Sequence, residues 1–264
     1  MRRFLSGSFI LVLTAGILLP FLPLLIWAFS RQWLFPDLLP ETWGLRAWNY
    51  VFGVAGPQVT SALVTSVSVS SLAALFSVAL ALPAARVLTF SGRKRGLFLQ
   101  FLFVLPILTP PLSVSMGLHL WFLKLGLTGS LPGVLLVHLT LCVPYAVFVL
   151  SGVFSNYNPL IEAQARSLGA SKWFVFSRVT LPLILPGIIV AALFAFLLSW
   201  SQYLNTLIIG GSKVMTLPVL LFSLLRSGDR PVAAAVSLVI VLPAFAALLI
   251  SARTLGRRAW IGGW

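Results

Sequence analysis

The apolar segments of this chain restrict its fold more than any other feature. Six of them reach about 20 residues, the length that an α-helix needs to cross the hydrocarbon core of a bilayer. The chain of 264 residues is 59% hydrophobic and only 8% charged, whereas a soluble domain carries about 25% charged residues. The sequence therefore predicts an all-α integral membrane protein with six transmembrane helices in one membrane domain, residues 1–264. The predicted spans are approximately 7–29, 59–87, 98–123, 131–153, 181–205 and 231–252.

Two apolar stretches need a separate interpretation. The first span follows Met-Arg-Arg, but it is too long for the core of a signal peptide and has no small-x-small cleavage pattern. We therefore expect it to remain as a span. The stretch 216–225 is apolar but too short to cross a bilayer. It predicts a re-entrant or interfacial helix.

The basic residues predict how the spans are oriented. A net charge of +14 would suggest nucleic acid for a soluble protein, but in membrane proteins Lys and Arg collect on the cytoplasmic flanks of the spans. Six spans place both termini on one side. That side carries twelve basic residues, namely Arg2, Arg3, Arg86, Arg93, Lys94, Arg95, Arg166, Lys172, Arg178, Arg253, Arg257 and Arg258. The other side carries six, namely Arg31, Arg46, Lys124, Lys213, Arg226 and Arg230.

This asymmetry predicts that both termini and the loop 154–180 are cytoplasmic, and that no nucleic acid is a partner. The loop 30–58 is then outside. It is rich in aromatic residues, which suits a cap at the level of the lipid headgroups. The tryptophans expected at that interface are Trp33, Trp43 and Trp48.

The loop 154–180 encodes a short helix outside the bilayer. Asn158 followed by Pro159 is typical of a helix start. Glu162 then lies in the first turn, where a negative charge suits the helix dipole. Gly169 is suited to a left-handed C-terminal cap, and Ser171 to the cap of a second helix.

The helix in this loop has a narrow apolar stripe formed by Ile161, Ala165 and Leu168. A helix of about ten residues is marginal on its own and needs a surface to pack against. The residues alone leave two alternatives open. The helix either rests on its own bundle or docks onto a cytoplasmic partner.

The loop resembles the EAA loop of the permease subunits of binding-protein-dependent ABC importers. The family pattern is Glu-Ala-Ala, three residues, Gly, nine residues, and Ile-x-Leu-Pro. Here Gly169 is followed by nine residues and then by Val-Thr-Leu-Pro at 179–182. The family's Glu-Ala-Ala falls on residues 163–165, so Glu162 is displaced by one position. The small-residue-rich segment 59–87 also resembles the second helix of these permeases.

The resemblance implies a type I ABC importer permease fold, also called MetI-like, with a cytoplasmic coupling helix. It implies a pore of two permease subunits, the same chain or different ones, in a bacterial or archaeal cytoplasmic (inner) membrane. ATPase subunits would bind the loops and hold ATP and magnesium, while an extracytoplasmic solute-binding protein delivers the solute. The residues expected to contact the ATPase are Glu162, Ala163, Gln164, Ala165, Arg166, Leu168 and Gly169.

No catalytic motif occurs in the sequence, so we expect a transport subunit and not an enzyme. There is no G-x-x-x-x-G-K followed by Ser or Thr, and this chain is expected to bind no cofactor. His119 and His138 have no Cys, Asp or Glu at ligand spacing, and the single Cys142 suits an apolar core. The alternative class is a self-contained secondary transporter or channel. Such proteins usually need intramembrane acidic residues, and the predicted spans contain none.

Polar residues within spans mark the candidate solute path, because such residues tend to face the interior of a bundle. In the fifth span, Ser201 with Asn205 and Gln202 with Thr206 are spaced i, i+4, which predicts two adjacent rows on one helix. In the third span, Pro106, Pro110 and Pro111 predict a broken helix. Its outer half carries three further candidates, Ser113, Ser115 and His119. Either set can equally serve hydrogen bonding between helices or the shaping of a kink.

The solute stays open at this stage. The stretches beginning "FPDLLPETWGL" and "IGGSKVMTLPVLL" resemble the putrescine/spermidine branch of these permeases and its iron, thiamine and phosphonate relatives. This resemblance favours a polyamine-like solute. The absence of acidic residues from the spans favours instead a solute that needs no carboxylate partner, such as a small anion.

The predicted topology can be tested by labelling single cysteines in a Cys142→Ser background. Arg95→Cys and Lys213→Cys are expected to react with an impermeant reagent from opposite faces of the membrane, because an odd number of spans separates them. Labelling of both positions from the same face would contradict the six-span arrangement.

Overall fold

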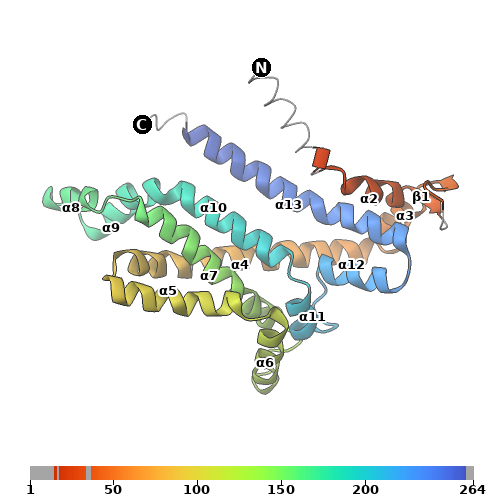
Figure 1. Cartoon of the computed structure of the whole chain (residues 1–264), viewed down its shortest axis with the longest axis horizontal. Helices are drawn as coiled ribbons and strands as arrows, with labels where there is room; N and C mark the ends of the chain where they lie inside the picture. The colour runs from red at the N-terminus through yellow and green to blue at the C-terminus, as the bar shows by residue number, and fades with distance from the viewer. Residues whose placement is uncertain (1–14, 17, 34–36, 260–264) are drawn as a thin grey trace. The chain divides into compact units, whose positions relative to one another are not determined.

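The computed structural model describes residues 15–16, 18–33 and 37–259 (Figure 1). The chain divides into two compact units. Unit 1 comprises residues 1–63 and 217–243, and unit 2 comprises residues 64–216 and 244–264. Helices dominate both units, as the apolar segments predict. Two long helices, α4 (Gly56–Phe90) and α13 (Arg230–Ala259), have residues in both.

Unit 1 contains α2 (Phe21–Ala28), a small antiparallel pair of strands, and a short helical segment that leads into α4. The strands β1 (Ser30–Gln32) and β2 (Thr42–Trp43) pair Ser30 with Trp43 and Gln32 with Thr42. They lie in the loop 30–58, for which the sequence predicts no strand. The remaining elements are α3 (Arg46–Asn49), the π-helical turn η1 (Tyr50–Val54), α12 (Leu217–Arg226) and the first part of α13.

Unit 2 contains the helices that carry the candidate sites. They are α5 (Arg93–Leu108), α6 (Pro111–Lys124), α7 (Leu131–Ser155), α8 (Leu160–Ser167), α9 (Lys172–Val175), the π-helical turn η2 (Phe176–Thr180), α10 (Leu181–Trp200) and α11 (Leu204–Gly210). They join the greater part of α4 and the last part of α13.

Four described helices are long and apolar enough to cross a membrane, namely 56–90, 131–155, 172–200 and 230–254. A fifth span results if α5 and α6 are counted together. Each of the predicted second to sixth spans thus coincides with apolar helix of sufficient length, the third only when α5 and α6 are counted together. The first predicted span, 7–29, lies largely outside the described residues, and α2 covers only its last part. The stretch 216–225 is the short helix α12, as its length predicts.

The third predicted span, 98–123, is not one straight helix. The axes of its two parts differ by 94° at the break between Leu108 and Pro111. Thr109 and Pro110 adopt extended ψ angles of 136° and 130°, because a residue that precedes proline is driven out of the α region. The predicted break is therefore confirmed, but it bends the chain sharply instead of kinking one span.

The fifth predicted span, 181–205, is also too long at its C-terminal end. Helix α10 ends at Trp200, and α11 begins only at Leu204. The Ser201 hydroxyl donates to the Leu198 carbonyl at 3.0 Å. Serine competes in this way for backbone groups at helix ends.

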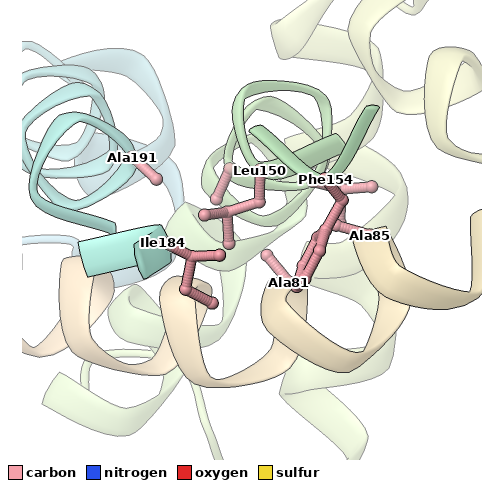
Figure 2. Close-up of a cluster of buried hydrophobic side chains, with 8 residues drawn as sticks. Ala81, Ala85, Leu150, Phe154, Ile184 and Ala191 are labelled. Carbon is pink, nitrogen blue, oxygen red and sulfur yellow. The ribbon is translucent and has the colours of Figure 1, made fainter. Parts of the chain in front are cut away.

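The core of unit 2 lies where α4, α7 and α10 meet (Figure 2). Ala81 and Ala85 on α4 are fully buried, and Figure 2 shows Leu150 and Phe154 of α7 and Ile184 of α10 directed toward them. Small residues allow helices to approach closely in a membrane. Ala81 and Ala85, which belong to the small-residue-rich second span, therefore form one side of this core.

Helices α7 and α10 also meet at Gly187. A Cβ atom at that position would lie 2.2 Å from Cγ2 of Val153, which is far inside van der Waals contact. Valine has few side-chain conformations in a helix and cannot move its methyl group away easily. Gly187 is therefore required here by the distance between the two helices.

We expect Gly187→Ala to lower the free energy of unfolding of the detergent-solubilised protein by about 1–3 kcal/mol, because the added methyl group overpacks the interface. The melting temperature should fall accordingly. Combining it with Val153→Ala should recover most of that loss. Gly152→Ala is the matched control, since nothing lies within 4 Å of the Cβ position there. Equal melting temperatures for Gly187→Ala and Gly152→Ala would show that the contact does not restrict the site.

Candidate functional site

The helix predicted in the loop 154–180 is α8, and its ends follow the expected chemistry. The Asn158 side-chain oxygen accepts a hydrogen bond from the Leu160 amide at 3.0 Å. Gly169 has a φ of +86°, which is the left-handed cap that its position predicts. Ser171 caps α9 by accepting a bond from the Phe174 amide at 3.2 Å. These three predictions are confirmed, although the helix itself begins at Leu160.

Glu162 is the buried residue of α8, with 4% of its surface exposed. Arg86 donates two hydrogen bonds to its carboxylate, at 3.0 and 2.7 Å. The hydroxyls of Tyr157 and Thr180 each donate to the same carboxylate at 2.9 Å. Arg166, one turn further along α8, approaches Oε2 at 3.1 Å. We call these five residues the Glu162 cluster.

The Glu162 cluster joins α8 to the ends of three other helices. Arg86 lies near the C-terminal end of α4, and Tyr157 follows the end of α7. Thr180 is the last residue before α10. One carboxylate on α8 therefore holds together the ends of the three helices that form the core of unit 2. A bidentate arginine fixes orientation as well as distance.

The carboxylate is ionised at neutral pH. Burial by itself would raise the pKa of Glu162, but the hydrogen bonds from Arg86, Thr180 and Tyr157 outweigh burial and lower it from 4.5 to about 2. Burial raises the pKa of the Tyr157 hydroxyl, so this group stays protonated and can donate. The cluster is therefore an ion-pair network with a matched donor for each carboxylate oxygen.

A small cavity of about 190 Å³ lies beside the cluster. Arg86, Arg166 and Lys172 contribute three positive charges to its walls, against the single negative charge of Glu162. The cavity thus has a net positive lining. A positive lining suits contact with an acidic group. Arg86 and Arg166 are, however, already hydrogen-bonded to Glu162.

The predicted apolar stripe of α8 faces away from the bundle. Leu168 is 90% exposed, and Ile161 is 39% exposed. Two aromatic side chains of α9, Trp173 and Phe174, are also exposed. These apolar side chains are therefore not covered by the rest of unit 2. The other residues expected at the contact, Ala163, Gln164 and Gly169, are exposed as well, and Ala165 is half-buried.

A second group of polar residues lies in the interior of unit 2. The ring of His138 on α7 is bonded through Nδ1 to the Ser199 hydroxyl at 2.8 Å and through Nε2 to the Thr206 hydroxyl at 2.9 Å. Asn205 accepts a hydrogen bond from Ser115 and donates one to Gln202. The amide of Gln202 in turn reaches the His138 carbonyl at 3.5 Å. We call these six residues the polar chain.

The bonds of the polar chain fix the tautomer of His138. The Thr206 hydroxyl donates its hydrogen to the Gln202 carbonyl at 2.9 Å. It must therefore accept from Nε2 of His138, and in a neutral imidazole Nδ1 then accepts from Ser199. The ring joins α7 to both sides of the break between α10 and α11.

The predicted solute-path residues separate into two groups. Ser115, Gln202, Asn205 and Thr206 come together in the polar chain, across α6 and the break that follows α10. Ser201 is exposed, and its hydroxyl donates to the Leu198 carbonyl of α10. Two residues of α6, Ser113 and His119, also lie outside the polar chain. The prediction of two rows on one continuous helix is wrong, because the helix ends at Trp200.

Five residues of these clusters have no motif in the sequence that would identify them, namely Arg86, Tyr157, Thr180, His138 and Ser199. Arg86 counts in the sequence only as a cytoplasmic charge, and His138 only as a rejected metal ligand. The sequence does not show that Glu162 is buried. A buried carboxylate needs a cation partner, and the one acidic residue of this loop is consistent with a basic partner at a neighbouring helix end.

The comparisons with known proteins agree with this architecture. A family model described as "Binding-protein-dependent transport system inner membrane component" matches residues 77–260. The chain is 31% identical over 256 residues to the molybdenum transport system permease protein ModB of Mycobacterium tuberculosis, covering 91% of each chain. It is 23% identical over 252 residues to the spermidine/putrescine transport system permease protein PotC of Haemophilus influenzae, covering 95% of this chain and 96% of the other.

A crystal structure of a bacterial ABC transporter that imports the acidic polysaccharide alginate has the same fold. A chain of it matches with a TM-score of 0.66 at 17% identity, over 96% of this chain and 95% of that one. The predicted type I permease fold is thereby confirmed.

We expect Glu162→Gln to loosen α8 from the bundle, because Arg86 then loses its charged partner. Hydrogen bonds to charged groups contribute about 1.5–3 kcal/mol. Arg86 is 38% exposed, so screening reduces the effect to about 1–2 kcal/mol. Amide hydrogen exchange of residues 157–169 should accelerate roughly 5- to 30-fold. The control is Gln164→Ala on the exposed face, and equal acceleration in both variants would contradict the role of the cluster.

The protection of the α8 amides against hydrogen exchange should also depend on pH, and its direction follows from the pKa of Glu162. Because the pKa of Glu162 is depressed from 4.5 to about 2, its stabilising contribution is fully present above pH 4.5. This contribution is lost as the pH falls toward the folded-state pKa of about 2. Protection of α8 in the wild-type protein that already declines between pH 7 and 5 would contradict the ionised network.

Proposed function

The chain belongs to the family of binding-protein-dependent transport system inner membrane components, and on that premise we propose that it forms half of the pore of an ATP-driven importer. A second permease chain would form the other half, and separate ATPase subunits would hydrolyse ATP. An extracytoplasmic protein would deliver the solute. The family match and the fold support this arrangement, as does the crystal structure of the alginate transporter in complex with a periplasmic protein.

The observation that carries the proposal is the exposed apolar face of α8 and α9. Leu168 and Trp173 are 90% and 73% exposed, although the Glu162 cluster fixes α8 to the bundle. A rigidly held helix with uncovered apolar side chains is suited to dock into a groove of a partner protein. We assign this face to the ATPase and name α8 the coupling helix.

The proposed orientation places both termini and α8 in the cytoplasm. Two ion pairs support the assignment of residues to sides. Arg86 pairs with Glu162, and the basic-residue asymmetry puts both on the cytoplasmic side. Arg46 pairs with Asp229, and the same asymmetry puts both outside. Each pair would be impossible if the number of spans between its members were odd.

The solute that we propose is a small oxyanion. None of the described spanning helices contains Asp or Glu, so this subunit offers a cation no carboxylate within the membrane. The polar chain instead offers neutral hydroxyl and amide groups. The relation to a molybdenum permease at 31% identity favours the same class. A polyamine-like solute, suggested by the spermidine/putrescine permease, is the competing outcome.

We place the solute path beside Gln202 and Asn205. The backbone is non-helical at residues 201–203, and irregular backbone at membrane depth is tolerated where it lines a cavity or is buried in protein. The competing role is helix packing, because the members of the polar chain are hydrogen-bonded to one another in this conformation.

A secondary transporter or channel would move the solute without an ATPase, so copurification distinguishes the two classes. A tagged wild-type chain is expected to retain an ATPase. Leu168→Ser should weaken that association without affecting folding, because the side chain is exposed. Gly169→Val, which places a β-branched residue at a positive φ and costs about 1 kcal/mol or more, should weaken it too. Ser167→Ala is the control, and full retention of the ATPase by both variants would contradict docking through α8.

The solute path is tested by Gln202→Ala and Asn205→Ala in the reconstituted importer. One lost solute hydrogen bond costs about 0.5–1.5 kcal/mol, or roughly two- to twelvefold in apparent affinity. We expect molybdate or a phosphonate to stimulate ATP hydrolysis, with half-maximal concentrations raised by that factor. Stimulation by putrescine instead would overturn the oxyanion proposal. Unchanged concentration dependence together with lower thermal stability would make the polar chain a packing element.

A further inference from the structure

Unit 1 contains two cavities that are lined by neighbouring residues of the same segments. One has a volume of about 650 Å³ and is lined by residues of 27–33 and 227–231, together with Arg46. The other has a volume of about 620 Å³ and is lined by residues of 25–29 and 43–45. We call them the basic cavity and the apolar cavity.

The basic cavity has a net positive lining. Arg31, Arg46 and Arg230 line it, against one acidic residue, Asp229. Asp229 is already paired with Arg46. The guanidinium of Arg230 lies over the ring of Trp27, 5.6 Å from its centre. Within the described part of the chain no acidic group is paired with Arg31, so two cations remain for an anionic ligand.

The apolar cavity has no charged residue in its lining. Leu25 and Phe29 of the α2 region contribute to it from one side, and Trp43 and Leu45 from the other. These four side chains are 39–57% exposed. An exposed apolar hollow of this kind favours an apolar occupant, because covering it removes the surface from water.

Arg31 connects the two cavities. A Cβ atom at Gly44 would lie 3.6 Å from Cβ and 3.8 Å from Cδ of Arg31, so the stem of this arginine passes along Gly44. Gly44 lines the apolar cavity, while Arg31 lines the basic one. A single molecule with an anionic end and an apolar end could therefore occupy both.

We propose that these cavities bind one anionic phospholipid, with its phosphate between Arg31 and Arg230 and an acyl chain in the apolar cavity. Arginine recognises phosphate by two parallel hydrogen bonds. The position is also suitable. The apolar helix α2 ends at Ala28 and the spanning helix α13 begins at Arg230, so both cations lie at the ends of apolar helices, where headgroups are found.

The aromatic residues at this site strengthen the assignment to a lipid. Trp27 and Trp33 are stacked, with ring centres 4.3 Å apart, and both line the basic cavity. Tryptophan is enriched at the level of the headgroups. An acidic side chain of a docking protein would satisfy the arginines but would leave the apolar cavity uncovered.

The test uses the full chain, purified with its partner subunits and exposed to equal mole fractions of phosphatidylglycerol and phosphatidylcholine. Native mass spectrometry should show that phosphatidylglycerol is retained preferentially. Each arginine near the headgroups contributes roughly fivefold to such a preference, so Arg31→Gln with Arg230→Gln should reduce it roughly 25-fold. The matched control is Lys124→Gln, a cation that also lies over an indole ring, that of Trp121.

Four results would overturn the proposal. The wild-type protein could show no preference, or the double variant could keep it. Inorganic phosphate could displace phosphatidylglycerol at equal concentration, which would assign the basic cavity to a free anion. The double variant could also lose the extracytoplasmic binding protein while keeping its lipid, which would assign the cavity to protein docking.

Discussion

The carboxylate of Glu162 is the interaction on which the arrangement of unit 2 depends. It is the one acidic residue in the loop 154–180 of a chain that has four acidic residues in 264, and its hydrogen bonds reach the ends of α4, α7 and α10. Without it, α8 would be a short helix beside a membrane bundle, marginal by itself. With it, α8 is joined to the ends of the three core helices. If α8 docks onto the ATPase as proposed, a force applied to it would reach the helices that pack around Ala81 and Leu150.

The bilayer explains why the remaining polar groups are arranged as they are. A polar group within the membrane gains free energy from a partner in the protein, since lipid offers none. The polar chain satisfies this requirement with hydroxyl, amide and imidazole groups, and the break between α10 and α11 is where it gathers. Such hydrogen bonds contribute only about 0.6 kcal/mol each on average in a membrane protein. Residues of the polar chain can therefore exchange one hydrogen-bond partner for another at a low cost in free energy. A solute path requires such exchange.

The sequence predicted the helical membrane fold and the caps of α8, because both depend on short-range signals. Apolar length identifies spans, and the residue types at Asn158, Gly169 and Ser171 identify helix ends. It did not predict the direction of the chain after Pro110, since a proline marks a break but not its angle. It also missed the termination of α10 at Trp200, because hydropathy continues through the break. The hydrogen-bond partners of Glu162 could not be predicted from the sequence for a different reason. Arg86 and Thr180 are 76 and 18 residues away from it, and only the fold brings them together.

The central claim is that α8 is the surface through which this chain meets its ATPase, and site-directed crosslinking tests it most directly. A cysteine at Leu168, in a Cys142→Ser background, would be given a short photoactivatable crosslinker in the assembled importer. We expect a crosslink from Leu168→Cys to the ATPase. We expect none from Lys213→Cys, which the basic-residue asymmetry places on the other side of the membrane. A complex that couples ATP hydrolysis to import but gives no crosslink at Leu168→Cys would contradict the account.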